Sequence, residues 1–170
     1  MKGRTILVIA LAAVAAFLGG IYMGYFYHPI VPESLKMSPY GVSFDGLVEV
    51  DVSIEPPNVR LDNSCRRVAF DVTADQSLAI YNGLHGTWSV RPLTQDIMKD
   101  VMDNFGVKLL QVKIDRYEDE IYYATLTMRS GDDILVLDAR PSDSIALALR
   151  QNLPVYFDGS LFTEKSVGVC

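Results

Sequence analysis

The sequence contains few of the residues that bind transition metals. Among its 170 residues there are two cysteines and two histidines, and no CxxC spacing occurs. A zinc site built from cysteine and histidine needs four such ligands in short pairs, so this class of site is excluded. The two cysteines, Cys65 and Cys170, could form a disulfide in an oxidising compartment, and the sequence leaves this pairing open.

Basic residues are also scarce, with 15 Lys and Arg against 21 Asp and Glu. Two of the basic residues, Lys2 and Arg4, stand at the N-terminus, so residues 28–170 carry 13 basic and 21 acidic side chains. A domain with this balance is not held on nucleic acid by bulk positive charge. A small local basic site remains compatible with it.

Charged residues are absent from residue 5 to residue 32, and Thr5–Tyr27 is an almost wholly apolar run of 23 residues. At about 1.5 Å per residue, a helix of this length crosses a hydrocarbon layer of roughly 30 Å. The alternative is a signal peptide cleaved after the small residues 13–15, but cleavage there would leave a second apolar stretch at the new N-terminus. We therefore predict a transmembrane anchor in residues 1–27, in contact with the lipid bilayer through residues 5–27.

The charges beside this helix predict its orientation. Lys2 and Arg4 precede it, and the positive-inside bias places the more basic flank in the cytoplasm. We expect a single-pass membrane protein with a cytoplasmic N-terminus and an extracytoplasmic domain. Gly20 and Gly24 form a GxxxG pattern that favours close packing of two such helices, which predicts a homo-oligomer.

Strands and helices alternate irregularly in the rest of the chain. Residues 28–40 contain three prolines and are expected to form an extended spacer. Alternating apolar residues predict strands over 48–54, 66–73, 107–117, 121–129, 134–138 and 154–157. Helices are expected over 75–84, 92–105 and 141–150, the second with a buried face of Ile97, Met98, Val101, Met102 and Phe105. These elements indicate one compact α+β domain over residues 41–170, with mixed or antiparallel strands and about three helices.

Two polar clusters stand at the boundaries of these elements. The first begins a helix, as Arg91-Pro92-Leu93-Thr94-Gln95-Asp96, and the second joins a strand to a helix, as Asp138-Ala139-Arg140-Pro141-Ser142-Asp143-Ser144. Helix N-termini bind anions through their free N–H groups. We expect a polar pocket for a phosphodiester, with substrate bound by Arg91, Thr94, Asp96, Arg140 and Ser142. Asp138 and Asp143 are the candidate catalytic residues, and also the ligands of a divalent cation such as Mg²⁺ or Mn²⁺ if one is bound.

A structural role for the same residues is compatible with their spacing. With Pro141 at the first helical position, the Asp143 carboxylate can accept a hydrogen bond from the N-cap N–H. Asp138 would then pair with Arg91 or Arg140 in the interior. The tyrosines at 117, 122 and 123 offer a similar choice between stacking on bases and packing, and the acidic residues 118–120 between them favour packing.

The two clusters also carry a family resemblance. The stretch from Trp88 to about Val155 resembles the bifunctional nuclease domain family, in which an R-P-L-T-x-D element precedes a D-A-R-P-S-D-x-I-A-L-A-L-R element. The second element runs without a break from Asp138 to Arg150, and weaker similarity extends back to about Leu47. The resemblance implies an α+β domain that self-associates, with DNase and RNase activity in some members.

The chain departs from the family pattern at two positions. Gln95 stands where the family usually has histidine, and Gln76 where it usually has an acidic residue. Glutamine cannot act as a general base or as a strong ligand for Mg²⁺. We therefore expect a membrane-anchored nuclease that hydrolyses DNA or RNA at a low rate. The alternative is a non-catalytic domain of the same fold that binds a ligand or assembles at the cell surface.

Overall fold

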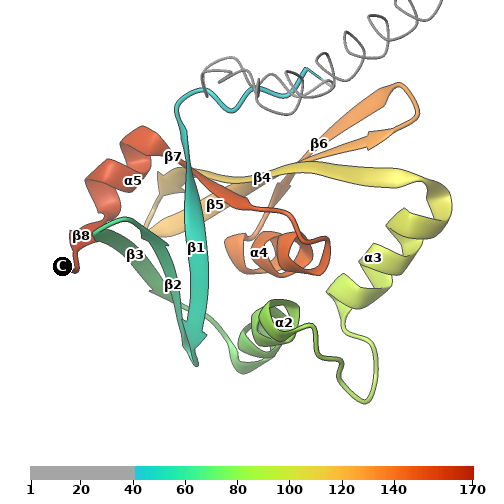
Figure 1. Ribbon diagram of the computed structural model, residues 1–170, viewed down its shortest axis with the longest axis horizontal. Helices are drawn as coiled ribbons and strands as arrows, with labels where there is room; N and C mark the ends of the chain where they lie inside the picture. Colours follow the sequence, from blue (N-terminus) through green and yellow to red (C-terminus); the bar gives the residue numbers. More distant parts are fainter. Residues whose placement is uncertain (1–40) are drawn as a thin grey trace, which may run out of the picture. The chain divides into compact units, whose positions relative to one another are not determined.

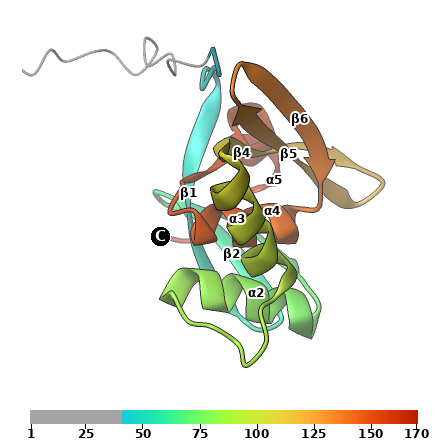
Figure 2. The same ribbon diagram turned by 90° about the vertical axis from the view of Figure 1, so that its right-hand side faces the viewer.

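The computed structural model describes residues 41–170, which form four helices and an eight-stranded sheet (Figure 1 and Figure 2). The strands are β1 (Leu47–Glu55), β2 (Asn58–Asn63), β3 (Arg66–Asp71), β4 (Val107–Glu118), β5 (Ile121–Ser130), β6 (Asp133–Ala139), β7 (Val155–Asp158) and β8 (Val167–Gly168). The helices are α2 (Ala74–His85), α3 (Thr94–Phe105), α4 (Pro141–Arg150) and α5 (Gly159–Lys165). The predicted α+β class is confirmed, with α5 in addition to the three helices expected.

The sheet has the strand order β6-β5-β4-β7-β1-β2-β3-β8. Within residues 41–170, neighbouring strands are antiparallel except for β4 and β7, which are parallel. A parallel pair needs a long crossover connection, and the chain between these two strands includes α4. This helix packs against β4 and β5, and α2 and α3 pack against it (Figure 1).

The α4 helix forms the centre of the hydrophobic core. Residues 144–148 of this helix are at most 1% exposed. A helix that is apolar on nearly every side must be covered on nearly every side, which the sheet, α2 and α3 accomplish together. Val59 and Leu61 of β2 and Phe157 of β7 are also fully buried in this core.

Local sequence signals set several helix boundaries. Helix α3 ends at Phe105, and Gly106 caps it with a φ of 68°, the left-handed conformation expected of a glycine at this position. Pro141 opens α4, as predicted. Helix α3 begins at Thr94 rather than Pro92, because the Asp96 carboxylate accepts a hydrogen bond of 2.8 Å from the Leu93 N–H and stabilises a start at that point.

The predicted buried face of α3 is wrong in part. Met98 packs against the core and Met102 is buried, but the other three side chains are largely exposed, with fractions of 54% for Ile97, 49% for Val101 and 76% for Phe105. The helix is rotated so that Asp96 is buried against α4. Successive helical residues are about 100° apart, so this rotation turns the side containing Ile97 and Val101 to solvent.

Three short elements, β2, α5 and β8, lie outside the set that the sequence predicts. Strand β2 has two core side chains between polar residues, and β8 pairs with β3 over two residues. Helix α5 begins at Gly159, where a Cβ atom would lie 2.8 Å from the Gly46 carbonyl oxygen. Patterns this short carry little local signal, and contacts with distant segments determine them.

A disulfide joins Cys65, in the turn between β2 and β3, to Cys170, with Cα atoms 5.2 Å apart. The pairing that the sequence leaves open is therefore present. Beside it, the Arg66 side chain donates hydrogen bonds to Ser166 Oγ at 2.7 Å and to the Thr163 carbonyl oxygen at 2.8 Å. The covalent and polar contacts together fasten the C-terminal segment to β3.

The predicted transmembrane anchor at residues 1–27 and the spacer at 28–40 lie outside the described residues. Among residues 41–170, no helix combines the length and the apolar character needed to cross a membrane. The anchor, its orientation and the domain boundaries therefore stay predictions.

Candidate functional site

Three helices begin at one cavity of about 570 Å³, which we call the helix-start cavity. Most of its polar lining comes from the starts of these helices: Thr73, Asp75 and Gln76 at α2, Thr94 and Gln95 at α3, and Arg140 and Asp143 at α4. Asp138, near the end of β6, also lines the cavity. The first N–H groups of a helix have no partner within the helix, and the helix dipole adds positive potential there. Three such ends and Arg140 favour an anion in this cavity, whereas the carboxylates of Asp75, Asp138 and Asp143 in the same lining oppose one.

The two glutamines of this cavity use their amides differently. Gln76 Oε1 accepts a hydrogen bond of 2.9 Å from the Thr73 N–H, and Thr73 Oγ1 accepts one of 3.4 Å from the Gln76 N–H. This reciprocal pair is a capping box at the start of α2. Gln95 Nε2 instead donates a hydrogen bond of 3.0 Å to Asp143 Oδ1. Gln76 thus stabilises a helix start, whereas Gln95 orients a candidate catalytic carboxylate.

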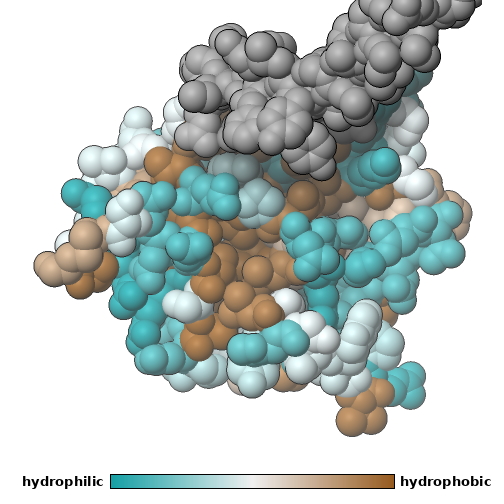
Figure 3. Space-filling view, viewed as in Figure 1, coloured by the Kyte–Doolittle hydropathy of each residue, from teal (hydrophilic) through white to brown (hydrophobic). Residues whose placement is uncertain are grey.

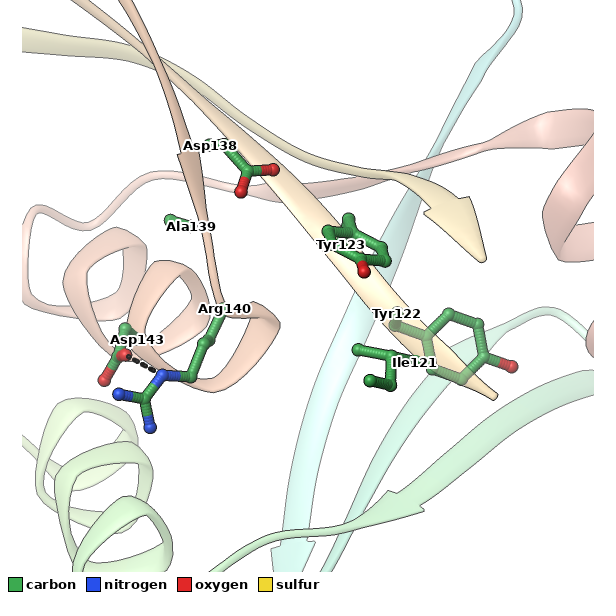
Figure 4. A pocket seen from close by; sticks show the side chains of 7 residues that line it. All are labelled: Ile121, Tyr122, Tyr123, Asp138, Ala139, Arg140 and Asp143. Atoms are coloured by element: carbon green, nitrogen blue, oxygen red, sulfur yellow. Dashed lines mark ion pairs between the residues drawn. The ribbon is translucent and has the colours of Figure 1, made fainter. Parts of the chain in front are cut away.

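Asp143 and Arg140 face each other at the start of α4. Arg140 Nε lies 3.7 Å from the second carboxylate oxygen of Asp143 (Figure 4). Their side chains are 77% and 44% exposed, respectively, so both can contact a bound molecule. The Asp143 carboxylate contacts the side chains of Gln95 and Arg140, and it does not accept the hydrogen bond from the N-cap N–H that a structural role predicts.

Asp138 does not pair with Arg91 or Arg140, the two partners that a structural role predicts for it. Arg116 Nη2 donates a hydrogen bond of 2.8 Å to Asp138 Oδ1, and the Asp138 side chain is 65% exposed. The expectation of an interior pair with Arg91 or Arg140 is therefore wrong. The reason is that β6 is the outermost strand of the sheet, so Asp138 stands at an edge, across β5 from the strand that bears Arg116.

Three of the predicted substrate-binding residues do not line this cavity. Asp96 is fully buried, and its Oδ1 lies 2.7 Å from Arg150 Nε. Ser142 is 5% exposed, and Arg91 is exposed in the segment between α2 and α3. The structure thus brings Thr94, Arg140 and the two candidate catalytic aspartates together, and leaves the other three outside the cavity lining.

A second cavity of about 380 Å³, the tyrosine cavity, adjoins the first. Asp138, Ala139, Arg140 and Asp143 line both cavities. The remaining wall of the tyrosine cavity is the start of β5, formed by Ile121, Tyr122 and Tyr123 (Figure 4). Thr73, Asp75 and Ile121 are residues of the site that the sequence does not predict, and Gln76, Tyr122 and Tyr123 are named there without being placed in it. The capping-box pattern at Thr73 and Gln76 is the signal that marks the α2 start.

The tyrosines divide between packing and cavity lining. Tyr122 contacts the Tyr117 and Phe157 rings, with centroid distances of 4.6 Å and 5.9 Å. Burial, followed by the nearby Tyr117 and Glu164, raises the pKa of the Tyr122 phenol, which keeps it neutral. Tyr117 and Tyr122 therefore pack against neighbouring rings, as the sequence favours, and Tyr122 also lines the tyrosine cavity. The Tyr123 ring lines the second cavity, with the Arg116 guanidinium carbon 4.6 Å from its centroid.

The side chains of the site do not fit a resident Mg²⁺ or Mn²⁺. No three His, Cys, Asp or Glu side chains of residues 41–170 are grouped so that they could hold a metal ion. Asp138 Oδ1 already pairs with Arg116, and the two carboxylate oxygens of Asp143 pair with Gln95 and Arg140, so three of the four oxygens that these aspartates could offer a hard cation face cationic or N–H groups.

Sequence comparison with known proteins identifies relatives of this chain. A sequence model of the bifunctional nuclease domain matches residues 60–169. An uncharacterised protein of Mycobacterium tuberculosis is 29% identical over 124 residues, which cover 69% of this chain and 74% of that protein. Bifunctional nuclease 2 of Arabidopsis thaliana is 34% identical over 68 residues, 38% of this chain and 21% of the plant protein. The residues that line both cavities all lie within the matched range 60–169.

Proposed function

Because this chain belongs to the bifunctional nuclease domain family, we propose that it binds a phosphodiester in the helix-start cavity and hydrolyses it. The observation that carries the proposal is the convergence of three helix starts and the Arg140 guanidinium on one cavity. Backbone N–H groups and arginine are the groups that proteins use most to hold phosphate oxygens. Arg140 and the helix starts are local sources of positive potential, so the overall acidic charge of the chain does not by itself exclude an anion site.

The roles of the side chains follow from their contacts. Arg140, largely exposed, pairs with a phosphate oxygen, and the Thr94 hydroxyl adds a hydrogen bond from the α3 start. As a water molecule attacks the phosphorus, Asp143 accepts its proton, and the hydrogen bond from Gln95 holds the carboxylate in place. The phosphorus–oxygen bond to the leaving group breaks, and the leaving oxygen takes a proton from solvent. Asp138 lies in the wall that the two cavities share. Since Gln95 cannot take a proton itself, we expect the rate of hydrolysis to be low.

A cleavage assay tests this proposal. The full-length chain should cleave single-stranded or double-stranded DNA or RNA in at least one of three conditions, with Mg²⁺, with Mn²⁺ or with a chelator. Replacing Arg140 by glutamine should lower the rate by about 100-fold, because one ionic contact to the developing charge is lost. Arg91→Gln is the matched control, since Arg91 does not line the cavity. A wild-type chain that is inert in every condition would leave the cavity as a binding site alone.

We also propose that the domain lies on the extracytoplasmic side of a membrane, anchored by residues 5–27. The Cys65–Cys170 disulfide supports this, because such bonds persist in oxidising compartments and are rare in the cytosol. A reporter enzyme that is active only outside the cytoplasm, fused after Cys170, should therefore be active. Activity of a cytoplasm-specific reporter at the same position would reverse the predicted orientation.

An assembly role is the second candidate, favoured by exposed apolar side chains. Strand β6 ends the sheet, and its Ile134, Leu135 and Val136 are 47%, 52% and 61% exposed. On the face drawn in Figure 3, apolar surface also gathers over α2 and α4. An exposed apolar edge strand is a ready site for pairing with another copy. Sedimentation of residues 36–170 should show an oligomer that Val136→Lys dissociates and Val90→Lys, on a distant loop, does not.

A further inference from the structure

The tyrosine cavity is not the place where the phosphodiester is cleaved, but it shares four residues with the helix-start cavity. Asp138, Ala139, Arg140 and Asp143 form the common wall. A phosphate bound by Arg140 therefore has the tyrosine cavity as its immediate neighbour. Whatever is attached to that phosphate on this side must lie against the start of β5 (Figure 4).

The start of β5 presents flat and apolar groups beside a cation. Ile121 is 56% exposed, and Tyr123 lines the same cavity. Figure 4 shows these two side chains across the cavity from Arg140. Strand β6 does not extend beside them, because its last pair with β5 joins Ala139 to Ala124. The wall is thus open to a ligand at the edge of the sheet.

The Tyr123 ring is held in position before any ligand binds. Arg116 lies over the ring, with its guanidinium carbon 4.6 Å from the ring centroid. The same guanidinium pairs with Asp138 at 2.8 Å and with Glu118 at 3.7 Å. The pair with Asp138 also offsets one of the two carboxylates that line the cavity, which would otherwise repel a phosphate. A fixed aromatic ring offers a stacking surface at low entropic cost.

We propose that the tyrosine cavity binds an unpaired nucleobase of the strand whose phosphate lies in the helix-start cavity, so that the substrate is single-stranded nucleic acid. This inference rests on the proposed function. Aromatic rings stack on any base, and the Ile121 and Arg140 side chains accommodate a base without selecting which of the four it is. In a duplex the bases are stacked and paired inside the helix, and none can enter such a cavity without being extruded.

Two oligonucleotides of equal length and equal phosphate number separate this inference from the function on which it rests. The first is oligothymidylate, and the second is an abasic strand that keeps every phosphate. The full-length chain should bind the first about 5- to 100-fold more tightly, the range expected for stacking of one base. A duplex of the same length should bind no better than the abasic strand.

Variants assign the difference to the cavity. Tyr123→Ala should abolish the preference for oligothymidylate and leave the affinity for the abasic strand unchanged, which also shows that the variant is folded. Tyr123→Phe should retain the preference, and Tyr81→Ala, an exposed tyrosine on α2, is the matched control. Arg140→Gln should weaken binding of both strands.

The outcomes are distinct. Equal affinity of the wild-type chain for both strands, with both weakened by Arg140→Gln, overturns the base-binding cavity and leaves the phosphodiester site in place. Failure to bind either strand overturns both proposals. A preference that survives Tyr123→Ala also overturns the inference, since the base must then lie elsewhere.

Discussion

Replacing Asp96 by alanine is expected to lower the free energy of unfolding by about 3–5 kcal/mol, the usual cost of breaking a buried ion pair by removing one partner. Asp96 is fully buried, and its carboxylate pairs with Arg150 Nε at 2.7 Å and accepts the Leu93 N–H at 2.8 Å. Without it, the Arg150 guanidinium remains in the interior with its charge uncompensated. The start of α3 would also lose its cap.

Urea denaturation with the disulfide intact measures this effect. The matched control is Asp103→Ala on the same helix, which removes an exposed pair with Lys99 and should cost less than about 1 kcal/mol. The double variant Asp96→Leu with Arg150→Met should recover much of the loss, because apolar groups of similar size can replace a buried pair. Equal costs for Asp96→Ala and Asp103→Ala would show that the buried pair contributes no more than a surface one.

Replacing Asp143 by asparagine is expected to lower the rate of phosphodiester cleavage by about 100-fold or more, the usual contribution of a positioned general base. Asparagine keeps the shape of the side chain but cannot take the proton of the attacking water. The Asp143 side chain is 44% exposed, so its stability effect should stay below about 1 kcal/mol. Asp138→Asn should give a smaller loss of rate, because the Asp138 carboxylate is already paired with Arg116.

Cleavage rates and urea midpoints are measured on the same preparations. Asp133→Asn, at the far end of β6, is the matched control and should change neither quantity, since Asp133 lines neither cavity. A purely structural role for Asp143 predicts the opposite pattern: an unchanged rate with a lower midpoint. The same comparison for Asp138 tests whether its exposed pair with Arg116 serves stability or the reaction.

Much of the local structure could be predicted from the sequence. Pro141 predicts the start of α4 and Gly106 the end of α3, because capping depends on residues within one turn of the helix end. The alternation in β1 likewise predicts a half-buried strand, as observed. The two motifs at 91–96 and 138–150 also indicated the family and the site residues that meet in the helix-start cavity, Thr94, Asp138, Arg140 and Asp143.

Tertiary structure alone decided which motif residues face solvent and which distant segments meet. Asp96 and Asp143 look alike in sequence, each an acid in the first turn of a helix. The rotation of α3 buries the first against Arg150, whereas the second stays open to both cavities. The start of α2 lines the helix-start cavity with the starts of α3 and α4. Cys65 forms a disulfide with Cys170, which is 105 residues away in the sequence. Strand order and helix packing set these contacts, and both depend on the whole core rather than on any local pattern.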